Sequence, residues 1–184
     1  RIGENFDGVM LTDDIILTNA IHYAFNNGAD ILSNSWNWAI PSSIISNEIH
    51  SAAVSGRQGK GCPIFFAVGN ESSATIQYPA SVPDVIAVGA TTSLDKKASF
   101  SNYSIGLDIS APGEGVITTD RVDMYGDTLG AVGSYTTVSG TSFSAPYAAA
   151  LMGLILSVKP SLTQLEARQI IESTCDKVGG YSYT

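Results

Sequence analysis

The chain has 184 residues, of which 44% are hydrophobic and 14% are charged, so it can bury the core of one domain and is not a disordered segment. Its net charge is −8, and its longest basic run is Lys96-Lys97. A nucleic-acid partner is not expected, because binding to phosphates requires clustered Lys and Arg side chains. We therefore expect a single domain over residues 1–184.

The residue types that usually mark disulfides, zinc sites and membrane spans are sparse. Cys62 and Cys175 form no disulfide framework, and we expect two buried free thiols. The two histidines, His22 and His50, show no spacing typical of a zinc site. The longest uncharged apolar run, residues 145–158, is too short to span a bilayer, and the first residues lack the apolar segment of a secretory signal.

Apolar residues at helical spacing alternate with short continuous apolar runs, which predict helices and strands respectively. In chain order we expect a helix over about 13–27, a strand over 29–35, a helix over 42–55, a turn over 56–61, strands over 63–68, 84–89 and 107–111, loop with hairpin strands over 113–135, and helices over 142–158 and 163–174.

Some of these elements carry clear start and stop signals. Thr12, Asp13 or Asp14 can cap the first helix, and Gly28 can end it. Thr163 and Glu166 have the spacing of a capping box at the start of the last helix. The helix over 142–158 is apolar on nearly all sides, which predicts a central buried helix. Residues 179–181 are expected to be a tail.

Alternating strands and helices predict an α/β fold with three layers, α/β/α, and a mostly parallel sheet. In such sheets ligands bind beyond the carboxyl ends of the strands. This rule places three segments at one edge of the sheet: residues 35–37, residues 69–71 and the turn that contains Ser142.

The segment from Ser139 to Pro146 is the strongest functional signal. It places Ser142 after Gly140 at the first turn of an apolar helix. A helix N-terminus offers unpaired N–H groups and a positive dipole, which favour an oxyanion near the serine. The alternative is an ordinary helix-capping serine.

Asn70 is the second signal, because it follows a buried strand and Gly69. From that position its side-chain amide can point beyond the sheet and donate a hydrogen bond to an oxyanion. The alternative is a simple turn with Glu71 and Ser72, which asparagine forms readily.

These two motifs, with residues 78–80 (YPA) and 109–113 (ISAPG) between them, resemble the subtilase family of serine proteases over about residues 13–174. The resemblance implies a partial subtilisin-like domain in which Ser142 is the nucleophile. The oxyanion donors are then the Asn70 side chain and the Ser142 N–H. It implies a polypeptide substrate, no cofactor for catalysis, and a family in which structural calcium is common. The implied substrate-binding residues are Ser33, Ser35, Trp36, Asn37, Ala67, Gly69, Gln77 and Thr141.

The family pattern breaks at the other two members of the catalytic triad. Subtilases carry an Asp in a D-T/S-G motif and a His in an H-G-T motif before the serine, and this sequence has neither. His22 and His50 lie in the middle of predicted helices. We therefore expect the C-terminal two-thirds of a catalytic domain, inactive by itself. Its strand over 31–35 should be an open edge that pairs with a second copy or with a complementing N-terminal segment.

Two further departures concern specificity. Asn37 and Gln77 stand where the family most often has glycine in the primary specificity pocket, so we expect small or polar side chains to be accepted there. The family also suggests an extracytoplasmic location. A non-catalytic peptide-binding or assembly module is the main alternative function. A lipase or esterase is disfavoured, because residues 140–144 lack the second glycine of the G-x-S-x-G elbow.

Overall fold

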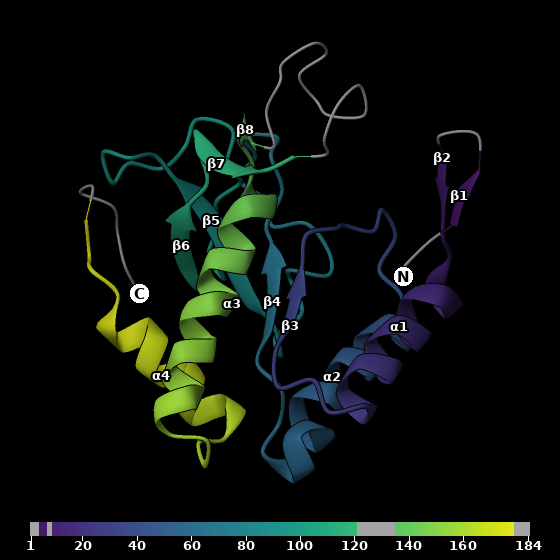
Figure 1. The fold of residues 1–184 in the computed structure, drawn as a ribbon. Coiled ribbons are helices and arrows are strands. Elements are labelled where there is room, and N and C mark those ends of the chain that lie inside the picture. The colour runs from purple at the N-terminus through teal and green to yellow at the C-terminus, as the bar shows by residue number, and fades with distance from the viewer. Residues whose placement is uncertain (1–3, 7–8, 121–134, 179–184) are drawn as a thin grey trace.

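The computed structural model describes residues 4–6, 9–120 and 135–178 (Figure 1). The helices are α1 (Asp14–Asn26), α2 (Ser43–Gly59), α3 (Thr141–Val158) and α4 (Gln164–Thr174). The strands are β1 (Glu4–Phe6), β2 (Val9–Leu11), β3 (Leu32–Asn34), β4 (Ile64–Ala67), β5 (Ile86–Thr91), β6 (Ile109–Pro112), β7 (Val116–Thr119) and β8 (Tyr135–Val138). The predicted helices and strands are all present, although β3 is shorter than expected. The predicted tail over 179–181 lies outside the described residues.

The central sheet has four strands in the order β3-β4-β5-β6, and every neighbouring pair is parallel. In the register, Leu32 pairs with Ile64, and Phe66 pairs with Ala87. Within the described residues β3 pairs only with β4, so its other side is an unpaired sheet edge. β7 and β8 form an antiparallel hairpin; β7 lies within the range predicted for hairpin strands, whereas β8 begins at the last residue of that range, Tyr135. β1 and β2 form a second hairpin, which the sequence did not predict.

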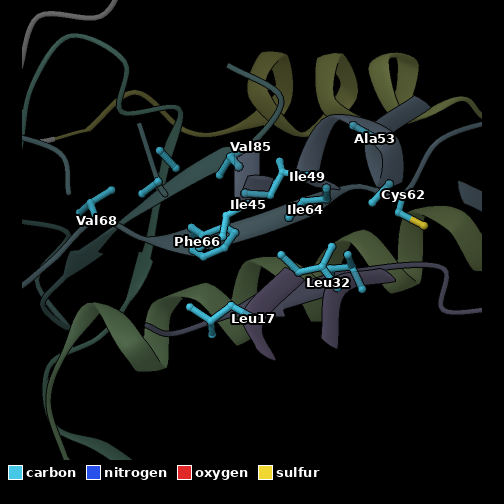
Figure 2. Packing of buried hydrophobic residues seen from close by; sticks show 14 residues of the cluster. Leu17, Leu32, Ile45, Ile49, Ala53, Cys62, Ile64, Phe66, Val68 and Val85 are labelled. Carbon is cyan, nitrogen blue, oxygen red and sulfur yellow. The ribbon is translucent and has the colours of Figure 1, made fainter. Parts of the chain in front are cut away.

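Alternate residues of β4 divide the core into two halves. Phe66 belongs to the half that contains buried residues of α1 and α2, whereas Phe65 belongs to the half that contains those of α3 and α4. Figure 2 shows the first half, in which residues from α1, α2 and the sheet converge; among them are Leu17, Leu32, Ile45, Ile49, Ile64 and Phe66. The fold is therefore the predicted three-layer α/β/α arrangement, with α1 and α2 on one face of the sheet and α3 and α4 on the other.

The helix ends follow the capping signals of the sequence. The Asp13 carboxylate accepts a hydrogen bond of 2.7 Å from the Ile16 N–H and caps α1. At the start of α4, the Thr163 hydroxyl and the Glu166 carboxylate form the predicted capping box. α2 departs from helical geometry at Gly56, where the sequence predicted a turn.

α3 is less buried than its sequence predicted. Seven of its residues are buried, and they pack towards the sheet. The opposite side carries an exposed apolar stripe at helical spacing, formed by Tyr147, Leu151, Leu154 and Val158, of which Leu154 is 66% exposed and Val158 87%. The prediction of a central helix buried all round is therefore wrong for the described residues.

α3 is also the one helix in the described part of the chain that is long and apolar enough to cross a bilayer, with a mean hydropathy of 1.4 over 18 residues. The core helix of a soluble protein meets the same criteria. Because one side of α3 packs on the sheet, the criteria do not by themselves identify a membrane span.

The two cysteines occupy different environments. Cys62 is buried and free, and burial raises the pKa of its thiol. Cys175 is also free but exposed, so the expectation of two buried thiols is wrong for Cys175. In the ranges that the structure describes, no group of three or more His, Cys, Asp or Glu residues could hold a metal ion.

Candidate active site

Asn70 and Ser142 meet where β4 ends and α3 begins. Asn70 is three residues beyond the end of β4 and is exposed, whereas the strand residues before it are buried. Ser142 is the second residue of α3 and is half-buried. Thr141, between Gly140 and Ser142, is fully buried and forms the physical link between the two segments.

Thr141 holds the oxygen of the Asn70 side chain through two hydrogen bonds. Its backbone N–H donates to Asn70 Oδ1 at 2.8 Å, and its hydroxyl donates to the same oxygen at 2.9 Å. The Gly69 N–H donates to the Thr141 hydroxyl at 3.3 Å. Because a backbone N–H can only donate, the atom that faces it must be the amide oxygen, and the orientation of the Asn70 carboxamide is fixed.

This arrangement leaves two donors unused beside Ser142. Within the described residues, neither the Asn70 Nδ2 nor the Ser142 N–H donates to a protein acceptor. Both groups flank Thr141, and the Ser142 N–H lies at the positive end of α3. Two donors at a helix N-terminus can stabilise an oxygen that gains negative charge during acyl transfer.

The β3 edge approaches the same point. The Ser35 hydroxyl donates to the Ser142 carbonyl at 2.8 Å, which ties the chain after β3 to the first turn of α3. Ser33 is exposed on β3. Trp36 is fixed by a hydrogen bond of 3.1 Å to Asn34 and by an edge-to-face contact with Phe66.

Three of the predicted substrate-binding residues surround one point beyond β4. The Asn37 side-chain amide donates to the Gln77 side-chain oxygen. Gln77 is also tied to β4, because its N–H donates to the Val68 carbonyl at 3.2 Å. Gly69 has a φ of +106°, and a Cβ there would lie 2.8 Å from the Gln77 side-chain carbon. Ala67 is buried at the end of the strand. Asn37, Gln77 and Gly69 therefore come together just beyond the end of β4.

Asn102 was not singled out from the sequence, although the structure places it against this site. It is 1% exposed, lies in the connection between β5 and β6, and forms hydrogen bonds to the chain on both sides of Asn70. An asparagine between a serine and a tyrosine carries no local signal of such a role. Only the parallel pairing of β4 and β5 brings it to this position.

Both histidines lie in the helical layer across the sheet from α3. His22 on α1 pairs with Glu48 at 2.7 Å, and His50 on α2 pairs with Asp84 at 3.1 Å. The interpretation of both as non-catalytic agrees with this placement. Within the described residues, the Ser142 hydroxyl has no histidine as a hydrogen-bond partner.

The carboxyl group of Asp108, just before β6, has a raised pKa and lies away from Asn70 and Ser142. Burial raises the pKa of Asp108, and hydrogen bonds from the Ala87 N–H at 2.7 Å and from Arg168 at 2.6 Å act in the opposite direction. Asp108 and Arg168 line a cavity of about 450 Å³, and a second cavity of about 420 Å³ lies beside Arg57. Neither cavity includes the residues that the sequence predicted for catalysis or substrate binding.

Known proteins resemble the chain over almost its whole length. The profile of the subtilase family, peptidase S8, matches residues 5–183. The thermophilic serine proteinase of Bacillus sp. (strain AK1) is 35% identical over 164 residues, which are 89% of this chain and 37% of that protein. The subtilisin of Bacillus pumilus is 33% identical over 171 residues, which are 91% of this chain and 57% of that protein.

Solved structures agree with this likeness. Sphericase superposes with a TM-score of 0.71 at 25% identity, covering 90% of this chain and 56% of its own. A cold-adapted subtilisin-like serine proteinase gives a TM-score of 0.69 at 24% identity, over 90% of this chain and 56% of that one. The chain thus spans between about a third and three-fifths of the relatives named here. The family profile, the sequence relatives and the shared fold together establish that the chain belongs to the subtilase family.

Proposed function

We propose that this chain supplies the nucleophile and the oxyanion-stabilising groups of a serine endopeptidase. In this proposal the Ser142 hydroxyl attacks the carbonyl carbon of a peptide bond, and the Asn70 Nδ2 and the Ser142 N–H stabilise the resulting oxyanion. The observation that carries the proposal is the pair of hydrogen bonds from Thr141 to Asn70 Oδ1. They orient the amide so that its nitrogen remains available beside the nucleophile.

Ser142 also requires a base, because a serine hydroxyl is a weak nucleophile at its ordinary pKa. His22 and His50 are paired with carboxylates on the far side of the sheet, so we expect neither to accept the Ser142 proton. We therefore expect the isolated chain to hydrolyse peptides at a negligible rate. The Asp and His of the triad would come from a segment that is not part of this sequence.

The free side of β3 is where we expect such a segment to pair. A strand with unpaired N–H and C=O groups is a template for another strand, and within the described residues β3 has only β4 as a neighbour. A complementing strand that brings the catalytic Asp would close this edge beside Ser35, which already contacts Ser142. Self-association through the same edge is the alternative, and a monomer by sedimentation at high concentration would argue against it.

For the substrate side chain next to the cleaved bond, we propose a preference for small or polar groups. The Asn37–Gln77 hydrogen bond connects two side chains at positions that are usually glycine in the family. Together with the Glu71 carboxylate, they would occupy the space that a large apolar side chain needs. We further propose an extracytoplasmic location, since relatives include proteins described as an extracellular protease and a cell wall-associated protease.

The function can be tested by complementing the chain. The part of the Bacillus pumilus subtilisin that precedes the matched region is fused to it, and cleavage of a quenched-fluorescence peptide library is measured for the chain alone and for the fusion. We expect cleavage only by the fusion, after small or polar residues. S142A should abolish it, and N70A should lower kcat about 10²–10³-fold, a magnitude known for subtilisin itself rather than derived from this structure.

The matched control is N26A, which removes an exposed asparagine amide from α1 and should leave kcat unchanged. Retained cleavage in S142A would contradict the proposed nucleophile. Rapid stoichiometric labelling of Ser142 in the isolated chain by a fluorophosphonate would contradict the proposed inactivity. A fusion that binds peptides without cleaving them would instead support the alternative, a non-catalytic peptide-binding module.

A further inference from the structure

Asn102 contacts the loop that carries Asn70 on both sides of that residue. Its side-chain oxygen accepts hydrogen bonds from the N–H groups of Glu71 at 3.0 Å and Ser73 at 2.9 Å. Its side-chain nitrogen donates to the Val68 carbonyl at 3.1 Å and to the Glu71 carboxylate at 2.7 Å. Its own N–H donates to the Gly69 carbonyl at 3.1 Å. Val68 and Gly69 precede Asn70, and the other two partners follow it.

These contacts use the whole hydrogen-bonding capacity of one buried carboxamide. An asparagine side chain has two N–H donors and an oxygen with two lone pairs, and Asn102 uses all four while only 1% exposed. The two N–H groups that face its oxygen fix the orientation of the amide. An aspartate at this position would place an anion against a carbonyl oxygen and against the Glu71 carboxylate, so asparagine is the side chain that fits.

The loop needs this support because its backbone is unusual. Gly69 has a φ of +106° and Ser72 a φ of +54°, so left-handed conformations stand on both sides of Asn70. The neighbouring chain reinforces the loop, since the Ser72 N–H donates to the Phe100 carbonyl at 2.7 Å. Thr141 fixes the side chain of Asn70, whereas Asn102 fixes the backbone from which that side chain extends.

We propose that Asn102 is a positioning residue for the oxyanion-stabilising amide of Asn70, a role that rests on the function proposed above. Asn102 does not touch the substrate. It sets the backbone of residues 68–73, and through it the place of the Asn70 Nδ2 relative to the Ser142 N–H. Its loss should therefore reduce kcat more than it changes KM, because an oxyanion forms only during the reaction.

The test uses N102D in the chain itself and in the active fusion. N102D retains an oxygen for the N–H groups of Glu71 and Ser73 but places a negative charge against the Glu71 carboxylate. In the isolated chain, we expect the NMR signals of the Asn70 side-chain NH2 to move towards averaged, solvent-exposed values. In the fusion, we expect kcat to fall about tenfold or more with KM within about twofold.

Two further variants separate positioning from general stability. E71Q, combined with N102D, introduces an amide that can donate to the new carboxylate and should recover part of kcat, while the contact with the Val68 carbonyl remains unfavourable. S101A is the matched control, because Ser101 is equally buried in the same loop, and its hydroxyl accepts from the Ala90 N–H of β5 and donates to the Asn102 backbone carbonyl but makes no hydrogen bond to residues 68–73. It should lower the melting temperature while leaving kcat and the Asn70 signals unchanged. If N102D does not fold, E71A removes one Asn102 partner at an exposed residue and should shift the Asn70 signals in the same direction.

The outcomes distinguish this inference from the proposed function. Unchanged Asn70 signals in N102D, or in E71A where N102D does not fold, would overturn the positioning role, whether or not peptides are cleaved. An equal loss of kcat in S101A and N102D would overturn it as well. A fusion without any cleavage, in which N102D still displaces the Asn70 signals, would overturn the proposed function and leave the positioning of Asn70 supported.

Discussion

The two helical layers of this domain differ in how their apolar side chains are packed. α1 and α2 pack on each other and on the sheet, so residues such as Ile45 and Ile49 are fully buried. In the other layer α3 packs on the sheet with one side and leaves Leu154 and Val158 exposed on the other. α1 and α2 also leave apolar side chains exposed, namely Ile15, Tyr23, Ile44 and Val54. On α3, however, the exposed apolar residues form one stripe at helical spacing, so we call the layer of α3 and α4 the open layer and the layer of α1 and α2 the closed layer.

The difference extends to chemistry. The open layer supplies Ser142 and the N-terminal dipole of α3, and its buried Thr141 orients Asn70. The closed layer holds both histidines in pairs with carboxylates, away from that site. The two candidate oxyanion donors thus depend only on the end of β4 and on the first turn of α3.

G69A should have the largest effect on stability, because it tests the junction between the sheet and the open layer. Gly69 has a φ of +106°, and a Cβ there would lie 2.4 Å from the Asn102 Nδ2 and 2.7 Å from the Glu71 carboxylate. We expect the free energy of unfolding in urea to fall by more than about 4 kcal/mol.

The matched control is G28A at the end of α1 in the closed layer. Gly28 has a φ of +90°, but a Cβ on this residue would have no neighbouring atom within 4 Å, so only the backbone conformation opposes the change. We expect a loss of about 1–2 kcal/mol. Equal losses in G28A and G69A would show that crowding by Asn102 and Glu71 does not contribute.

The next largest effect tests the two sides of α3 directly. Met152 is fully buried and Leu154 is 66% exposed, although they are two residues apart. We expect M152A to lower the free energy of unfolding by about 3 kcal/mol, through lost burial and the cavity that remains. L154A should change it by less than about 0.5 kcal/mol. I49A, at a fully buried residue of α2, should lower the free energy of unfolding as much as M152A does. This variant gives the corresponding value for the closed layer.

The same three variants also test whether the apolar stripe of α3 is exposed in solution. If L154A lowers stability as much as M152A, the apolar stripe of α3 is covered in solution. Measurement at two protein concentrations then separates self-association from burial within one chain, because only the former depends on concentration.

Local signals in the sequence predicted most of the fold. The run over 63–68 predicted β4 because a strand covered on both faces is apolar at successive residues, as the burial of Phe65 and Phe66 confirms. The spacing of Thr163 and Glu166 predicted the start of α4 because a capping box involves only neighbouring residues. The exposure of one side of α3 could not be predicted, because an apolar sequence does not show which sides of a helix pack against other elements.

For the candidate site too, the sequence predicted some residues and not others. Asn70 stands out because it directly follows Gly69 after a strand, and Ser142 because it lies two residues after Gly140 at the start of a helix. The resemblance to subtilases assigned them roles. The contacts of Asn102 with Val68 and Glu71 join residues more than 30 positions apart, so no local sequence pattern predicts them. The Asn37–Gln77 hydrogen bond likewise depends on two loops that only the sheet brings together.

The smallest effect compares the helix caps of the two layers. T163A removes the hydroxyl that caps α4, and D13A removes the carboxylate that caps α1. Each should lower the free energy of unfolding at pH 7 by about 1 kcal/mol.

The effect of the α4 cap should depend on pH. Hydrogen bonds from the Thr163 N–H and hydroxyl lower the pKa of Glu166 from its ordinary value of 4.5. A carboxyl group whose pKa is lower in the folded state stabilises the fold above its unfolded pKa, and that contribution disappears as the pH falls through the folded pKa. Urea unfolding at pH 7 and about pH 3 should therefore show a smaller cost of T163A in acid. The same cost at both pH values would show that the hydrogen bond between the Thr163 hydroxyl and the Glu166 carboxylate does not contribute to the cap.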